Sequence, residues 1–145
     1  IGLGIPAEPL FRSASHYEIL GENMKLIIAG GRDFTQGYIV YKVLYGLDND
    51  IIDEVVCGDA RGADTLGAEW ARLHYIPVKH FPADWDKYGK AAGYIRNSEM
   101  AEYGDMLIAF WDGKSRGTMN MIKAMKLHKK PYIVYNYEGE LIENG

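Results

Sequence analysis

The sequence predicts an α/β fold: an open, mostly parallel sheet of five strands with helices on both faces. Two observations predict it. Short apolar runs alternate with segments of helical periodicity, and this alternation continues through most of the chain. Successive parallel strands require right-handed crossovers, which place helices on both sides of the sheet. With 145 residues, 48% of them apolar, the chain is long enough to build such a core.

The expected strands are apolar runs, each about the length of a buried strand. They lie at residues 26–29, 51–57, 76–81, 106–111 and 132–135. The tail, residues 138–145, is expected either to add a short strand or to fray.

The expected helices lie between these runs, where apolar residues recur with the spacing i, i+3, i+4, i+7. The stripes are Val40, Val43, Leu44 and Leu47; Ala63, Leu66, Gly67 and Trp70; and Thr118, Met121, Ile122 and Met125. A less regular segment, 85–103, can hold a further helix. Residues 1–23 show neither period, whereas Met24 begins a strand-like run. We therefore expect residues 1–23 to be a leader or flexible arm and residues 24–145 to form a single domain.

Composition excludes several classes of protein. The net charge of −4 argues against a general nucleic-acid binder, since such binding needs a clustered positive surface. No apolar run approaches the roughly 20 residues that span a bilayer, so we expect a cytoplasmic protein with no membrane partner. The sole cysteine, Cys57, is interpreted as an apolar strand end rather than a reactive thiol. The four histidines are scattered, so neither a metal site nor a cofactor is predicted.

Three loops that follow expected strands combine glycine with arginine, at residues 30–33, 58–64 and 112–118. Glycine lets a backbone approach a phosphate closely, and a guanidinium matches phosphate oxygens. Such loops converge at the carboxyl edge of a parallel sheet, so they predict an anion-binding pocket. The predicted binding residues are Gly30, Gly31, Arg32, Asp33, Gly58, Arg61, Gly62, Asp64, Arg96, Asn97, Ser115, Arg116, Gly117 and Thr118.

Simpler explanations exist for each feature alone. Asp33 and Asp64 can accept ribose hydroxyls or act as general bases, but capping a helix or pairing with arginine is the commoner role. The turn at residues 82–86, with Trp85 and Tyr88, can be an aromatic wall for a base or a plain packed turn. Neither a Walker A loop nor the G-x-G-x-x-G spacing of dinucleotide dehydrogenases is present in these loops.

Together, residues 28–34, 58–64, 96–97 and 115–118 resemble the YspA-type branch of the SLOG superfamily, which is related to the Lonely Guy and Smf/DprA proteins. The resemblance covers essentially residues 24–137. It implies a Rossmann-like fold that binds a nucleotide or nucleotide-derived ligand, with a role as a sensor among the options. Members of this branch occur in bacteria and phages.

The Lonely Guy group cleaves the N-glycosidic bond of cytokinin nucleotides with a P-G-G-x-G-T-x-x-E loop. The corresponding segment here, residues 113–121, retains Gly117 and Thr118, and Arg96 can stand in for the arginine of that group. The acidic position, however, is Met121, which cannot handle a proton. The resemblance thus implies binding of a phosphorylated ligand and leaves open whether the chain is an enzyme.

The leading hypothesis is a binding or sensor domain in which Arg32, Arg61 and Arg116 hold the phosphates of a small nucleotide-derived ligand. An alternative is a hydrolase of a nucleotide N-glycosidic bond, with Asp33, Asp64 and Arg96 as candidate catalytic residues. A third is a DprA-like module for single-stranded DNA, which the low basic content disfavours. The eleven tyrosines leave room for a self-association surface, so a homodimer is one option.

Overall fold

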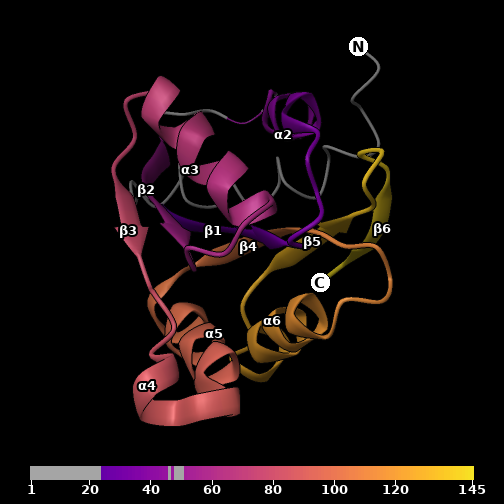
Figure 1. Cartoon of the computed structure of the whole chain (residues 1–145). Coiled ribbons are helices and arrows are strands. Elements are labelled where there is room, and N and C mark those ends of the chain that lie inside the picture. Colours follow the sequence, from indigo (N-terminus) through magenta and orange to yellow (C-terminus); the bar gives the residue numbers. More distant parts are fainter. Residues whose placement is uncertain (1–23, 46, 48–50) are drawn as a thin grey trace.

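The computed structural model describes residues 24–45, 47 and 51–145, and the expected leader, residues 1–23, lies outside this part. The described chain forms one six-stranded sheet of order β3-β2-β1-β4-β5-β6 (Figure 1). The first five strands pair in parallel, and β6 pairs antiparallel with β5. The open, mostly parallel, Rossmann-like sheet is confirmed. The tail adds a sixth strand to the expected five.

The bounds of the elements follow the sequence pattern with two exceptions: the first helix ends before Leu47, and the strand expected at residues 76–81 is shorter. The strands are β1 (Met24–Gly30), β2 (Ile52–Cys57), β3 (Val78–His80), β4 (Met106–Phe110), β5 (Tyr132–Tyr135) and β6 (Leu141–Asn144). The α-helices are α2 (Gly37–Leu44), α3 (Ala63–Leu73), α4 (Trp85–Tyr88), α5 (Ala92–Tyr103) and α6 (Arg116–Leu127). The irregular segment at 85–103 holds α4, a 3-10 turn and α5. Gly89, with φ of 58°, ends α4 in the left-handed region, which explains why no single helical period runs through it.

Helices cover both faces of the sheet, as the alternation predicts. Helices α2 and α3 lie on one face, and α5 and α6 lie on the other (Figure 1). The side chains of β1 alternate accordingly: Leu26 and Ile28 belong to the core under α2 and α3, whereas Ile27 and Ala29 belong to the core under α5 and α6. In the described part of the chain, no helix is long and apolar enough to cross a membrane.

The strand order reverses its direction between β1 and β4. From β1 the chain proceeds outward through β2 to β3, then returns to β4 on the other side of β1. In open parallel sheets this reversal creates a crevice outside the carboxyl ends of the two central strands, where ligands bind. The loops that follow β1 and β4 are therefore where the fold predicts a ligand site.

Candidate functional site

A cavity of about 400 Å³ opens at the carboxyl ends of β1 and β4. Four chain segments line it: the loop after β1, the start of α3, the segment from α4 into α5, and the loop that leads into α6. The predicted residues in its lining are Gly30, Gly31, Arg32, Asp33, Asp64, Arg96, Asn97, Ser115, Gly117 and Thr118. The folded chain thus brings most of the predicted binding residues to one place.

The remaining predicted residues lie elsewhere. Gly58 and Arg61 line a neighbouring cavity of about 290 Å³, to which Arg32 and Arg96 also contribute. Gly62 and Arg116 line neither of these two cavities. The three loop arginines therefore do not converge on one cavity: Arg32 lies in the lining of both, Arg61 in the smaller one, and Arg116 is exposed at the first residue of α6.

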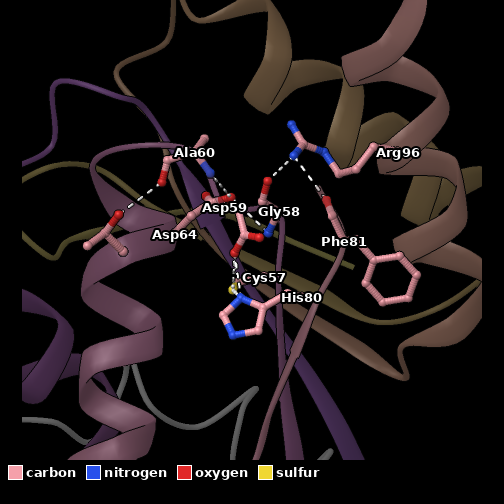
Figure 2. A network of polar contacts seen from close by, with 9 residues as sticks. Cys57, Gly58, Asp59, Ala60, Asp64, His80, Phe81 and Arg96 are labelled. Atoms are coloured by element: carbon pink, nitrogen blue, oxygen red, sulfur yellow. Dashed lines mark hydrogen bonds and ion pairs between the residues drawn. The ribbon is translucent and has the colours of Figure 1, made fainter. Parts of the chain in front are cut away.

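Arg96 is a buried side chain on α5, only 9% exposed. Its Nη1 donates to the carbonyl oxygens of Gly58 and Phe81, and its Nε donates to Asn97 Oδ1 at 3.1 Å (Figure 2). These two carbonyls directly follow β2 and β3. Arg96 consequently joins α5 to the ends of two strands, and it brings a positive charge into the wall of the cavity.

Asp64, near the start of α3, lies opposite Arg96 across Gly58. Its Oδ2 accepts hydrogen bonds from the backbone N–H of Gly58 (3.0 Å) and Ala60 (3.4 Å), as Figure 2 shows. Burial raises the pKa of Asp64 to about 6, because the charge of Arg96 and the two hydrogen bonds offset only part of the desolvation. This carboxyl group therefore titrates not far below neutral pH.

Gly58 is required by the space between these two side chains. A Cβ at this position would lie 2.5 Å from Arg96 Nη1 and 2.9 Å from Asp64 Oδ2. Gly62, with φ of 80°, occupies a backbone conformation that other residues rarely adopt. Gly58 thus serves the packing of Asp64 against Arg96, and Gly62 serves the turn that packs on the backbone of Gly31 and Arg32.

The loop after β4 also uses a carboxylate to satisfy its amides. Asp112 Oδ1 accepts hydrogen bonds from the backbone N–H of Lys114 and Ser115, both at 2.8 Å, and these bonds lower the pKa of Asp112. Ser115 Oγ accepts from the N–H of Thr118 at 3.3 Å and caps α6. Gly117 N–H lies in the first turn, where helices offer no internal acceptor, and Gly117 lines the cavity.

Sequence reasoning did not single out two residues of the cavity wall. Lys90 and Tyr94 line the cavity beside Trp85, and the Trp85 and Tyr94 side chains are about half exposed. Lys90, Tyr94 and Asn97 are spaced by four and three residues, a helical pattern that could have found them. Tyr88, which was paired with Trp85 as a predicted aromatic wall, is not in the lining.

Hydrogen bonds hold two of the lining residues, Asn97 and Asp33, in place. Asn97 donates through Nδ2 to the Gly117 carbonyl (3.3 Å) and to Asn120 Oδ1 (2.9 Å), which fixes α5 against α6. Asp33 Oδ1 accepts a hydrogen bond from the Tyr137 hydroxyl at 2.5 Å. One carboxylate oxygen of Asp33 is therefore bonded to a residue that follows the last parallel strand, β5. Tyr137 is another residue that sequence reasoning missed, because it lies 104 positions from its partner.

The apolar part of the lining includes Met100 and Met121, both buried. Met121 stands at the position that is acidic in the Lonely Guy loop. The cavity therefore presents a thioether there, and the acids that it offers are Asp33, Asp64 and Asp112 instead.

Comparison with known proteins supports the resemblance seen in the loops. Residues 24–88 match the YspA, cpYpsA-related SLOG family. The chain is also 41% identical over 76 residues to the Gene 61 protein of Mycobacterium phage D29, an alignment that covers 48% of this chain and 60% of that protein. The chain thus spans less than two thirds of this relative. The family match includes the loops after β1 and β2 and ends before Arg96 and α6.

Proposed function

We propose that this chain, which belongs through residues 24–88 to the YspA, cpYpsA-related SLOG family, binds a nucleotide or nucleotide-derived phosphorylated ligand in the cavity between the ends of β1 and β4. Membership of this family supports a nucleotide-related ligand at a coarse level. The observation that carries the proposal is the composition of the cavity at the strand-order reversal. It combines cationic side chains, a helix N-terminus and half-exposed aromatic rings.

The phosphate would be held by the cationic side of the lining. Arg32 and Lys90 are exposed side chains with donors free to reach a ligand, and Arg96 adds its buried charge nearby. The N–H of Gly117 at the start of α6 adds a backbone donor and the favourable end of the helix dipole. Arg61 and Arg116 have no part in this proposal, because neither lines this cavity.

The carboxylates of the lining favour a ligand that carries donors as well as a phosphate. Asp33, Asp64 and Asp112 would repel a bare anion, but they can accept hydrogen bonds from ribose hydroxyls or exocyclic amino groups. Trp85 and Tyr94 offer ring faces on which a base can stack, an interaction worth about 1–3 kcal/mol. We therefore expect a nucleotide to bind more tightly than inorganic phosphate or a free nucleoside.

The test is thermal unfolding of the full chain against nucleoside mono-, di- and triphosphates, ADP-ribose, cyclic nucleotides, nucleosides and inorganic phosphate. A ligand that binds only the folded state stabilises it by about 2.7 kcal/mol when its free concentration is 100 times Kd. We expect at least one nucleotide to raise the midpoint and inorganic phosphate to leave it nearly unchanged. The proposal fails if no phosphorylated compound raises the midpoint.

Variants then locate the site. Arg32→Ala and Trp85→Ala are each expected to weaken binding at least tenfold by calorimetry, since both exposed side chains line the cavity. The control is the double variant Arg61→Ala/Arg116→Ala, which removes two positive charges outside this cavity, more than either test variant removes, and should keep the affinity. Loss of binding in the double variant would instead support the assignment made from the sequence, in which Arg61 and Arg116 hold phosphates together with Arg32.

Asp64 favours a second candidate function, hydrolysis of a nucleotide N-glycosidic bond. It is an acid in the cavity lining whose pKa is raised to about 6, which suits a group that gives up or takes a proton near neutral pH. The assay is release of free base from the nucleotide identified above. We expect Asp64→Asn to abolish release while it retains binding. Absence of release from every nucleotide that binds would leave the binding function alone.

A further inference from the structure

A second cluster of side chains lies at the ends of β2 and β3, on residues that the proposed nucleotide site does not use. Cys57 is the last residue of β2, His80 is the last residue of β3, and Asp59 follows in the next loop. Cys57 and His80 are partners in the parallel register of the two strands, so their side chains leave the sheet on the same face. Figure 2 shows the sulfur, the imidazole and the carboxylate pointing toward one another.

Two of the three distances among the ligand atoms match those around a tetrahedral zinc ion. Cys57 Sγ lies 3.6 Å from His80 Nδ1 and 3.6 Å from Asp59 Oδ1. Around a tetrahedral zinc ion, bonds of about 2.3 Å to sulfur and about 2.0–2.1 Å to nitrogen or oxygen place sulfur about 3.6 Å from either partner. The third distance differs. His80 Nδ1 and Asp59 Oδ1 are 2.5 Å apart, and both would need to separate to about 3.4 Å to bind the same zinc ion. The His80 and Asp59 side chains are 51% and 39% exposed, so both have room to rotate.

We propose that Cys57, Asp59 and His80 form a zinc-type divalent metal site in which Cys57 Sγ, Asp59 Oδ1 and His80 Nδ1 are the protein ligands. A thiolate, an imidazole and a carboxylate together select zinc over calcium or magnesium, which prefer oxygen ligands alone. Three protein ligands leave a fourth position for water or a substrate atom. The proposal is independent of the nucleotide site, since none of these three residues lines the larger cavity.

The arrangement does not suit the main alternative, a cysteine nucleophile activated by a His–Asp pair. In such a triad the acid and the nucleophile contact opposite nitrogens of the imidazole. Here both Cys57 Sγ and Asp59 Oδ1 approach the same nitrogen, Nδ1 of His80. Burial also raises the pKa of the Cys57 thiol to about 12, so the free thiol is a poor nucleophile at neutral pH. Convergence on a single point is what a metal requires.

A backbone contact further suits a bound thiolate. The backbone N–H of Asp59 hydrogen bonds to the Cys57 sulfur, and such second-shell donors stabilise a metal-bound thiolate. A metal has to displace the proton of this buried thiol, so we expect a site of moderate rather than extreme affinity. The sequence predicted no metal site, because its four histidines are scattered. His80 is 23 residues from Cys57, and only the strand register brings the two together.

The experiment uses Co²⁺ as a spectroscopic substitute for Zn²⁺ on the tag-free, reduced full chain. Cys57 is the only cysteine in the sequence, so a thiolate-to-cobalt charge-transfer band can arise only from this residue. We expect the band in the wild-type chain and its displacement by one equivalent of Zn²⁺. Cys57→Ser should abolish it, and His80→Gln should lower the affinity for Co²⁺ at least tenfold.

The matched control is His128→Gln, which removes an exposed histidine at the end of α6, far along the chain from this cluster. It should bind Co²⁺ as the wild type does. Since His80 is an exposed side chain, His80→Gln should fold normally, which circular dichroism checks independently of the buried Cys57. The proposal is overturned if the wild type shows no charge-transfer band, if His80→Gln binds Co²⁺ as tightly as the wild type, or if His128→Gln loses the band.

Discussion

Asp64 and Asp112 serve the same local purpose in two different loops, and their surroundings make them opposites. Each carboxylate accepts hydrogen bonds from two backbone N–H groups of the loop that follows a parallel strand, β2 for Asp64 and β4 for Asp112. Asp64 is 4% exposed and has a pKa raised to about 6, whereas Asp112 is exposed and has a lowered pKa. The two pKa values therefore shift in opposite directions, although the hydrogen-bonding pattern is the same.

The difference teaches that desolvation outweighs the hydrogen bonds at Asp64. The two amides and Arg96 all favour its charged form, yet the loss of water raises its pKa. At Asp112 water still solvates the carboxylate, so the hydrogen bonds decide. Asp64 and Arg96 consequently form a buried polar pair around Gly58 that leaves no room for an added Cβ, whereas the Asp112 carboxylate is exposed and should be less sensitive to substitution. Three substitutions test this contrast.

Gly58→Ala should have the largest effect, because the new Cβ would press against both Arg96 Nη1 and Asp64 Oδ2. Displacing a buried acid and a buried base is expected to cost about 3–5 kcal/mol of unfolding free energy, measured by urea denaturation. The control is Gly117→Ala in the first turn of α6, where nothing lies within 4 Å of a new Cβ. It should be neutral or up to about 1 kcal/mol stabilising. Equal stabilities for the two variants would remove the contrast between the loops.

Asp64→Asn should have the next largest effect, and the effect should depend on pH. Because the folded-state pKa of Asp64, about 6, lies above its ordinary value of 3.8, the favourable contribution of its protonated form is complete below about pH 4. That contribution is lost as the pH rises through 6, by up to about 3 kcal/mol. Asparagine keeps the acceptor oxygen and never ionises.

The stability of Asp64→Asn relative to the wild type should therefore increase between pH 4 and pH 7, as measured by urea denaturation across that range. A relative stability that decreases over the same range would mean that attraction to Arg96 exceeds the desolvation of Asp64.

Asp112→Asn should have the smallest effect and the opposite sign. The lowered pKa of Asp112 means that its ionised form stabilises the fold above its ordinary pKa, and that this contribution is lost as the pH falls through the lowered value. The side chain is exposed and asparagine retains the acceptor, so the loss at pH 7 should stay below about 0.5 kcal/mol. Chemical denaturation at pH 7 and at acidic pH measures it; a loss above 1 kcal/mol would show a more buried role.

The sequence by itself determined the architecture and the region of the site. Apolar runs and helical stripes depend on the periods of strands and helices, which are local properties of the chain. Parallel strands then force the loops at residues 30–33, 58–64 and 112–118 to one edge of the sheet. Of the residues in these loops, Arg32, Asp64 and Gly117 lie in the lining of one cavity.

Only the tertiary structure decided which side chains of those loops face the cavity. Arg32 and Arg116 both lie in glycine-containing segments that follow strands, yet Arg32 lines the cavity and Arg116 does not, because the direction of a side chain depends on backbone angles and packing. Arg96 is directed inward by carbonyl groups that follow β2 and β3. The pairing of Cys57 with His80 depends on strand register, which long-range packing sets and no local pattern contains.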